Sequence, residues 1–545
     1  MQQDTSGGFS LASLAGGIGW LNRRRLTLLA AVLLALIFYG AAYWTSPERP
    51  DGSADHPTLG WWAWFDQGQY YQSVKALQRN DFTPAEHWYP IGYPLVGTLF
   101  YPIMPLHPFL IPNLLCFFVI CAGFMWICQM IVSPGEALLL CFFAVIWPAT
   151  LRDNIIRPWT NTPVSAALMI LAYLALAGRR DRFPGMATGA CAAIIFMMRP
   201  GDLLYSWPIM TALWFGSRDW RDALRRAGWF AAGATPLGAI SLFYSVAIHG
   251  NVVSELYRRS SELVGFGFAS LGIKLYTFFI DGFPFFGESR TLVTVFPFLL
   301  VVLPGAVVFV QEFKWKAGVV IATQAGAFLY FLAYNDFWIA NLFRYGAIRY
   351  WLWIVPFCCL YSYMTIRFAW RKLGWIKTAV LILIPLLTCT VPRIGIRPAR
   401  WKLLPSMSPA QPSFPDALAR DQRQSGWVCQ AGSGGSCGTD LAFVVPVSFD
   451  ILKLQGVFPP GSLNFAIVWV DNQKNQNFHD FIAAEGPNAQ YSLIFYGRKR
   501  GKSVRLLLPA AIGNEKVLVS GVGLAERHVG LALRNPFKVF HPDQR

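Results

Sequence analysis

The stretch "RRRLTLLAAVLLALIFYGAAYW" (residues 23–44) decides the fold class of this chain. Its apolar part, Leu26–Trp44, contains no charged residue. It approaches the roughly 20 residues that an α-helix needs to cross a bilayer. Three arginines precede it and no signal-peptide cleavage pattern is present. The pattern therefore predicts a retained first membrane span that follows a cytoplasmic N-terminus, residues 1–25.

Similar apolar runs continue far along the chain. The 545 residues are 54% hydrophobic and only 14% charged, whereas a soluble protein carries roughly a quarter charged residues. The apolar runs end near residue 392, and residues 393–545 have the composition of a soluble domain. We therefore expect a polytopic α-helical membrane domain, residues 26–392, followed by a C-terminal extramembrane domain, residues 393–545.

The positions of the basic residues predict the topology. Apolar segments lie near 26–44, 93–106, 109–131, 136–150, 161–177, 184–198, 202–216, 229–248, 291–310, 317–334, 347–366 and 376–392. Basic clusters occur at 23–25, 178–183, 217–226, 314–316 and 367–377. Because cytoplasmic loops carry an excess of Lys and Arg, all five clusters should be cytoplasmic. The net charge of +17 is then a signal of orientation rather than of nucleic-acid binding.

An even number of crossings must separate the cytoplasmic clusters, so one of the five apolar segments before Arg179 does not cross. The proline-rich "YPLVGTLFYPIMP" (93–105) best suits a re-entrant or interfacial helix. About eleven crossings remain. The two large loops, 45–108 and 249–290, then lie outside the membrane together with the C-terminal domain.

The C-terminal domain is predicted to be β-rich. Short β-branched or aromatic runs such as "LNFAIVWV" and "AQYSLIFYG" are separated by Gly, Pro and Asn, which favours a sandwich or small barrel. Cys429 and Cys437 flank a Gly/Ser loop, and we expect a disulfide there if the domain is exported. A zinc site is disfavoured because no second Cys/His pair accompanies them. The sequence has no Asn-x-Ser/Thr acceptor, which favours a bacterial origin.

Asp66 is the candidate catalytic residue. It lies in the first large loop, within "WWAWFDQGQYYQSV" (61–74), beside Trp61, Trp64, Tyr70 and Tyr71. Such aromatic residues are typical of a membrane-interface belt and also of a sugar-binding cleft. A carboxylate in a partly desolvated cleft can act as a general base. The competing interpretation is an ordinary solvated loop carboxylate.

Several arginines lie on the predicted outer side, against the positive-inside bias. Each alone fits an interfacial position with its charged group in the headgroup region. Together they predict a site for an anionic headgroup near the outer leaflet, because the guanidinium group suits bidentate phosphate contacts. The candidates are Arg152, Arg157, Arg199, Arg344 and Arg349.

The segment "FDQGQYYQSVKALQRNDFTPAEHWYPIGYPL" (65–95) resembles the first exterior loop of the GT-C glycosyltransferases. That superfamily includes the protein O-mannosyltransferases, the aminoarabinose transferases and the lipopolysaccharide sugar transferases. The segments 187–209, 285–305 and 343–356 are similar to later parts of these enzymes. Gln67 stands where many members carry a second acid, and this departure counts against an acid pair or a metal site.

The resemblance implies an integral-membrane glycosyltransferase of the bacterial inner (cytoplasmic) membrane, with its active site facing the periplasm. The donor would be a polyprenyl-phosphate sugar, and the acceptor a glycan, a lipid or a protein. Asp66 would deprotonate the acceptor hydroxyl, and the arginines would stabilise the leaving phosphate. No cofactor is then needed, although a divalent cation is compatible with the scheme. The side chains expected to shape the cleft are Tyr70, Tyr71, Trp61, Trp64, Tyr89, Tyr93 and His87.

Two other interpretations stay open. A transporter or flippase for a lipid-linked saccharide needs ionisable residues within its spans, and segments 109–131 and 291–310 have essentially none. An enzyme resembling the O-antigen ligases or polymerases relies on arginine and histidine in a late exterior loop, and the loop here, 335–346, is short.

Overall fold

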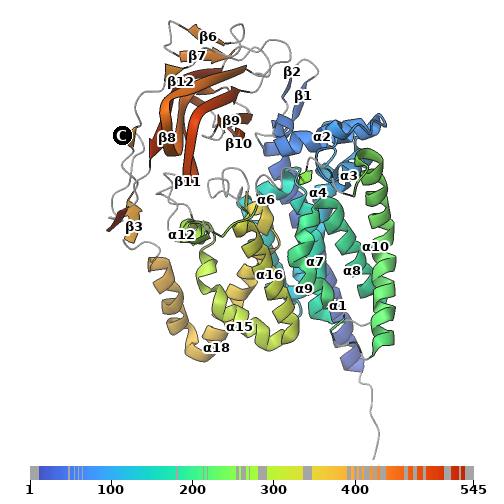
Figure 1. Cartoon of the computed structure of the whole chain (residues 1–545). Coiled ribbons are helices and arrows are strands. Elements are labelled where there is room, and N and C mark those ends of the chain that lie inside the picture. The colour runs from blue at the N-terminus through green and yellow to red at the C-terminus, as the bar shows by residue number, and fades with distance from the viewer. Residues whose placement is uncertain are drawn as a thin grey trace, which may run out of the picture.

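A computed structural model of the chain describes residues 11–388 apart from short stretches, of which 280–290 and 335–346 are the longest. From Ile394 onward it describes the backbone of strands only. The described part before residue 389 is predominantly helical (Figure 1). Its first half contains α1 (Leu11–Thr45), α2 (Phe65–Gln78), α3 (Gly92–Phe100), α4 (Leu110–Cys128), α5 (Pro134–Cys141), α6 (Ala149–Ile156), α7 (Asn161–Ala177), α8 (Arg182–Met198) and α9 (Leu203–Thr211). Its second half contains α10 (Trp220–His249), α12 (Leu271–Phe279), α14 (Leu292–Val295), α15 (Val302–Phe313), α16 (Trp315–Ala333) and α18 (Ile354–Thr388).

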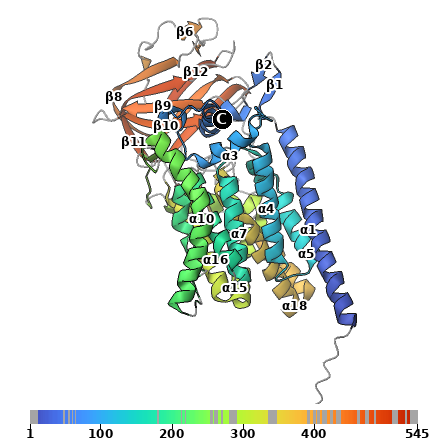
Figure 2. The same cartoon turned by 90° about the vertical axis from the view of Figure 1, so that its right-hand side faces the viewer.

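In the described part, four helices are long and apolar enough to cross a membrane, namely α1 from Arg23 onward, α4, α10 and α16. A fifth span is possible if α5 with its continuation to Ile146 and α6 count as one, although they are bent by 65°. The bend coincides with a π-helical turn, Phe142–Ile146, followed by Pro148, and both features interrupt the regular hydrogen-bond ladder. Figure 2 shows α1 as a long helix along one side of the bundle. The chain therefore has the helices of a membrane protein.

Two segments differ from the predicted spans. Segment 202–216 was expected to cross, but it forms only the nine-residue helix α9, which contains Pro208. Segment 291–310 is divided among α14, a 3-10 turn at Pro297–Val301 and α15. The predicted pair 347–366 and 376–392 corresponds to the two parts of α18, which meet at a kink at Gly374, whose φ of 75° is a conformation that glycine adopts readily. Hydropathy detects the apolar runs but not the places where Pro and Gly break them.

The basic clusters gather at one end of the helical bundle. Arg24 donates to the carbonyl of Gln129 at 3.1 Å, and Arg367 donates to that of Ile131 at 3.1 Å, so both meet the end of α4. Lys316 donates to Leu176 at 3.3 Å, at the end of α7. Cations are favourable beside the carbonyl groups that end a helix. Turns that are far apart in the sequence thus share one side, as the topology prediction requires.

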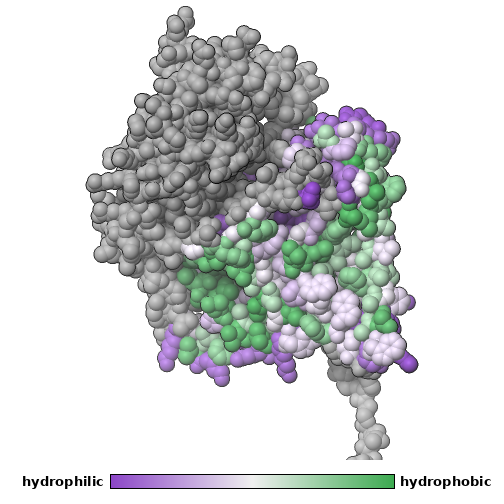
Figure 3. Space-filling model, viewed as in Figure 1, coloured by the Kyte–Doolittle hydropathy of each residue, from purple (hydrophilic) through white to green (hydrophobic). Residues whose placement is uncertain are grey.

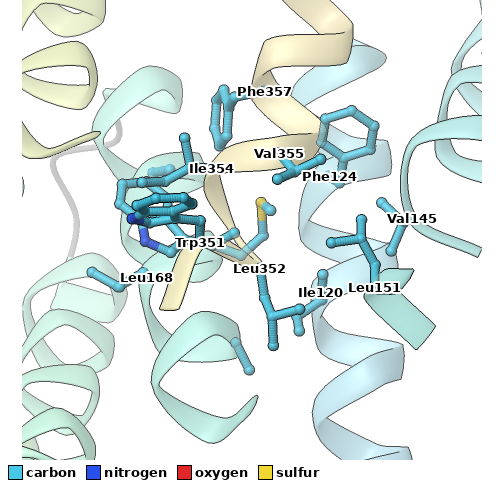
Figure 4. Packing of buried hydrophobic residues seen from close by; sticks show 14 of the residues in the cluster. Ile120, Phe124, Val145, Leu151, Leu168, Trp351, Leu352, Ile354, Val355 and Phe357 are labelled. Carbon is cyan, nitrogen blue, oxygen red and sulfur yellow. The ribbon is translucent and has the colours of Figure 1, made fainter. Parts of the chain in front are cut away.

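The centre of the bundle is a continuous apolar core. Ile120 and Phe124 of α4 lie close to the segment Leu352–Phe357, which leads into α18 (Figure 4). The rings of Phe124 and Phe357 meet edge to face with centroids 6.3 Å apart. Outward-facing apolar residues such as Leu29 and Ile37 are exposed, as expected for a lipid-facing surface. Figure 3 shows this apolar surface along the helices, with hydrophilic residues at the lower edge.

Helices α8 and α10 approach each other through glycine. A Cβ atom at Gly189 would lie 1.9 Å from the carbonyl oxygen of Phe230, and one at Gly233 would lie 1.9 Å from that of Met186. Gly185 and Gly189 form a small-xxx-small pattern, which lets helix backbones pack closely in a membrane. This contact orients α8, which carries Arg199 at its end.

The backbone beyond residue 393 contains β3 (Ile394–Arg397), β4 (Lys402–Leu403), β5 (Ser408–Pro409), β6 (Leu418–Asp421), β7 (Gly426–Cys429), β8 (Cys437–Phe458), β9 (Asn464–Val470), β10 (Gln476–Ile482), β11 (Gly486–Leu508), β12 (Val517–Glu526) and β13 (Gly530–Leu533). The main sheet has the order β10-β9-β11-β8-β12-β7-β6, and its neighbouring strands pair in the antiparallel direction (Figure 1). Cys429 ends β7 and Cys437 begins β8. Their side chains lie outside the described residues, so the disulfide stays a prediction.

Candidate functional site

Asp66 lies in the first turn of α2, where the partial positive charge of a helix N-terminus favours a carboxylate. The Tyr89 hydroxyl donates a hydrogen bond of 2.5 Å to its Oδ1 atom. The Nη2 atom of Arg349 lies 3.5 Å from its Oδ2 atom. The Asp66 side chain keeps 32% of its surface exposed. Among the described residues the carboxylate contacts Tyr89 and Arg349, and it remains partly exposed to solvent.

Arg349 is far from Asp66 in the sequence but contacts it in the fold. It lies in the 3-10 turn Ala347–Trp351, and its guanidinium carbon stacks 3.6 Å from the centre of the Trp159 ring. Its side chain is only 12% exposed. Planar stacking on an aromatic ring suits arginine and leaves the edge of the guanidinium group available for anions. Trp159 therefore holds Arg349 against the carboxylate.

A second arginine, Arg199, also lies against the Tyr350 ring. The guanidinium carbons of Arg199 and Arg349 lie 5.0 and 4.9 Å from the centre of the Tyr350 ring. Arg199 also pairs with Asp202 at 3.0 Å, and Asp202 is almost fully buried. Asp202 thus offsets the charge of Arg199. Arg349 is the arginine that contacts the partly exposed Asp66 carboxylate. Asp202 was not among the predicted residues, although its place in the Arg-Pro-Gly-Asp turn, three residues after Arg199, could have indicated this pair.

The tyrosines around Asp66 are held in the protonated form. Burial raises the pKa of the Tyr89 hydroxyl well above its usual value, and the negative charge of Asp66 raises it further. Burial likewise raises the pKa of Tyr70, with Asp66 as the next cause. A protonated hydroxyl can donate to the carboxylate, whereas a phenolate would repel it. Both tyrosines therefore act as neutral polar groups at physiological pH.

Gln67 follows Asp66 directly in the sequence, and its polar side chain is buried without hydrogen-bond partners among the described residues. It is 1% exposed, and neither its amide nitrogen nor its carbonyl oxygen has a hydrogen-bond partner within the described part of the chain. Leaving such groups unsatisfied costs roughly 1–3 kcal/mol each. In the resemblance to the GT-C enzymes, Gln67 stands only for a missing second acid. The structure makes it a polar group next to the candidate base.

Three of the predicted aromatic cleft residues pack against other rings of the protein. Trp61 is 1% exposed and meets Tyr43 edge to face. Tyr93 stacks on Phe109 at 4.2 Å and donates to Asn113 at 3.0 Å. Tyr71 stacks on Trp62 at 4.5 Å. Of the predicted aromatic residues that are described, Tyr89 and Tyr70 are the ones placed beside Asp66.

His87 is a structural residue rather than a substrate ligand. It is fully buried, and its ring nitrogens bond to the Ser73 hydroxyl at 2.7 Å and to the Asp81 carbonyl at 2.8 Å. With both nitrogens occupied, it ties α2 to the loop that follows. Its identity alone gave no indication of this role.

Arg152 also takes a place away from Asp66. It donates to the carbonyls of Ile146 at 3.4 Å and Trp147 at 3.3 Å, and it lies over the Phe38 ring. Arg157 follows α6, and its carbonyl accepts a hydrogen bond from Asn113 at 2.9 Å. Trp64 and Arg344 lie outside the described residues. The structure thus brings Asp66, Tyr70, Tyr89, Arg199 and Arg349 together, and it gives Arg152 a helix-capping role.

The described residues contain no group of three or more His, Cys, Asp or Glu side chains that could hold a metal ion. The polar groups that contact the Asp66 carboxylate are the Tyr89 hydroxyl and the Arg349 guanidinium group. These groups favour an anionic ligand rather than a cation.

If the chain transfers sugar as the resemblance implies, replacing Tyr89 with Phe should slow this transfer about tenfold without unfolding the protein. The variant loses one hydrogen bond to a charged carboxylate, and such bonds contribute about 1.5–3 kcal/mol. Tyr43→Phe is the matched control, because its hydroxyl bonds to His107 at 3.1 Å and not to Asp66. Turnover by both variants should be compared with their thermal stability. Equal turnover by the two would remove Tyr89 from the site.

Comparisons with known proteins add little to this geometry. The sequence matches no protein-family model and no curated protein. Similar solved structures include the family 32 carbohydrate-binding module of Streptococcus pneumoniae EndoD, with 9% identity, a TM-score of 0.18, and coverage of 23% of this chain and 100% of that one. A pectin-binding module has 15% identity, a TM-score of 0.16, and coverage of 23% and 91%. A Ruminococcus gnavus GH29 fucosidase has 11% identity, a TM-score of 0.15, and coverage of 20% and 21%. TM-scores this low carry no argument about fold or function.

Proposed function

We propose that this chain is an integral-membrane glycosyltransferase of the GT-C type. It moves a sugar from a polyprenyl-phosphate donor to an envelope acceptor, which is a glycan, a lipid or a protein. The observation that carries the proposal is the contact between the partly exposed Asp66 carboxylate and the stacked guanidinium group of Arg349, 3.5 Å apart. A base for the acceptor and a cation for the donor phosphate are thereby adjacent.

The chemistry assigns one role to each group. Asp66 takes the proton of the acceptor hydroxyl, whose oxygen attacks the anomeric carbon of the donor. The bond from that carbon to the phosphate oxygen breaks, and the electron pair leaves on the polyprenyl phosphate. Attack opposite the leaving group inverts the anomeric configuration. Arg349, supported by Arg199 across Tyr350, stabilises the charge on the departing phosphate.

Asp66 and the donor phosphate would both contact Arg349, and donor binding shifts this arginine toward the phosphate. Without donor, its guanidinium group faces Asp66. An arginine presents several donors in one plane. It can therefore contact a phosphate while it remains stacked on Trp159 at 3.6 Å. Moving part of its interaction to the phosphate leaves Asp66 more available as a base.

The proposed setting follows from the sequence. The basic end of the bundle faces the cytoplasm by the positive-inside rule. Asp66 and the β-rich C-terminal domain then face the periplasm of a bacterial inner membrane. The polyprenyl chain lies in the bilayer among the helices. No nucleic acid takes part.

A direct test uses the purified full-length protein with a panel of short-chain polyprenyl-phosphate sugars. Release of polyprenyl phosphate, followed by mass spectrometry, reports transfer to an added acceptor or to water. At least one donor should be consumed. Movement of intact donor across a liposome membrane without any release would favour a flippase and contradict the proposal.

Arg349→Gln should reduce donor turnover by at least about 100-fold, because one charge-stabilising group at a developing anion contributes roughly 10²–10³ in rate. Arg152→Gln is the matched control, since that guanidinium group binds the Ile146 and Trp147 carbonyls instead. The measurement is initial rate against donor concentration. If Arg152→Gln lost more activity than Arg349→Gln, the assignment of the phosphate site would be wrong.

A further inference from the structure

A cavity lies at the end of the bundle opposite Asp66. Its volume is about 140 Å³. On this measure one water molecule needs about 10–15 Å³, so the cavity has room for a polar headgroup on the order of ten waters in size. Helix α7 connects the two ends: Thr160, just before it, contacts Tyr70, and Gly178, just after it, lines the cavity. At about 1.5 Å per residue, the cavity is about 25 Å from the proposed active site.

Two cationic side chains line this cavity, Arg226 of α10 and Lys316 of α16. The Lys316 ammonium group bonds to the Leu176 carbonyl at 3.3 Å, a contact that does not neutralise its charge. Arg226 pairs with Asp222 at 2.7 Å, but Asp222 is shared with Arg225 at 2.8 Å. Among the described residues that line the cavity, both charged side chains are cationic, which favours an anion.

Glycine makes room for the lysine. Gly178 has a φ of 63°, and a Cβ atom there would lie 2.2 Å from the Lys316 nitrogen. Any larger residue would push the ammonium group out of its place. The position of the charge is therefore built into the turn after α7.

The rest of the cavity lining is apolar apart from Thr188. Leu171, Leu174 and Ile209 line the inner side. Phe215 and Trp315 line the outer side, where both are about half exposed and meet edge to face with centroids 5.6 Å apart. Exposed tryptophans among basic turns mark the membrane interface. A ligand with a charged end and an apolar end matches this combination.

We propose that this cavity binds the phosphate group of an anionic ligand from the inner leaflet, with Arg226 and Lys316 as its ligands. Basic pockets between membrane helices on the cytoplasmic side commonly hold anionic lipid headgroups. The acyl chains would leave past Phe215 and Trp315 into the bilayer. This site is separate from the proposed donor site, and its test does not depend on catalysis.

The test measures retention of phosphatidylglycerol on the purified full-length protein by native mass spectrometry, with phosphatidylcholine as the reference lipid. Each of Arg226→Gln and Lys316→Gln should weaken the apparent affinity for phosphatidylglycerol about tenfold, the effect of losing one charge-assisted hydrogen bond. Arg225→Gln is the matched control. It removes the same charge and also breaks a contact with Asp222, but Arg225 does not line the cavity.

Inorganic phosphate distinguishes the source of the anion. If it binds with an affinity that both substitutions weaken, while phosphatidylglycerol shows no advantage over phosphatidylcholine, the ligand is a soluble phosphate and the anion site stands. Equal binding of every probe by wild type, Arg226→Gln, Lys316→Gln and Arg225→Gln would overturn it. If Arg226→Gln does not fold, because it also loses its ion pair, Lys316→Gln still decides the question.

Discussion

Asp66→Asn is expected to lower the rate of sugar transfer about 10²–10⁴-fold, the usual contribution of a general base. The substitution preserves the shape of the side chain and its place in the first turn of α2. It removes the negative charge that accepts the proton and that attracts Arg349. Donor binding should change far less than turnover, because the arginines remain. Single-turnover measurements with a saturating donor would separate the two effects.

The control for this prediction lies in the same loop. Asp81 is a partly exposed acid that accepts a hydrogen bond from the Thr83 amide at 3.0 Å and lies 4.0 Å from Arg79. Asp81→Asn should keep nearly full activity. Comparable thermal unfolding of both variants would show that folding is intact. An Asp66→Asn protein that still transfers sugar at the wild-type rate would sink the mechanism.

Gly189→Val should destabilise the helical bundle severely. Its Cβ atom alone would lie 1.9 Å from the Phe230 carbonyl, so α8 and α10 would have to separate. Inserting groups into a tight contact costs typically 1–3 kcal/mol and occasionally more. Here the obstacle is backbone, which cannot rotate away, so the cost should lie at or above the upper end. Thermal unfolding of the purified protein and its yield in membranes measure the effect.

Gly228→Val provides a comparison on the same pair of helices. A Cβ atom at Gly228 would meet nothing within 4 Å. This variant pays the cost of replacing glycine with a β-branched residue in a helix but creates no clash. It should unfold close to the wild-type temperature. Equal loss of stability in the two variants would mean that the close approach of α8 and α10 is not what stabilises this region.

The candidate site was only partly predictable from the sequence. Asp66 and Arg349 carried a local signal, namely charge in an aromatic loop and charge against the topological bias. His87 and Trp61 shared similar surroundings, yet both are buried structural residues. Burial depends on which segments meet, and residue type alone does not report it. Asp202 was missed, and Gln67 was noted only as a departure from the family pattern, because the sequence does not show that both side chains are buried.

The sequence by itself determined that this chain has apolar helices for a membrane and that its basic turns belong on one side. Both properties depend on residues that are neighbours in the sequence. The free energy of placing a segment in a bilayer is determined mainly by the segment's own side chains, and the orientation by the charges of the adjacent turns. Only the tertiary structure decided that Arg349, rather than Arg152, faces Asp66. That choice depends on how the turn before α18 packs against Trp159 and the start of α2, and no local pattern encodes a contact between segments so far apart.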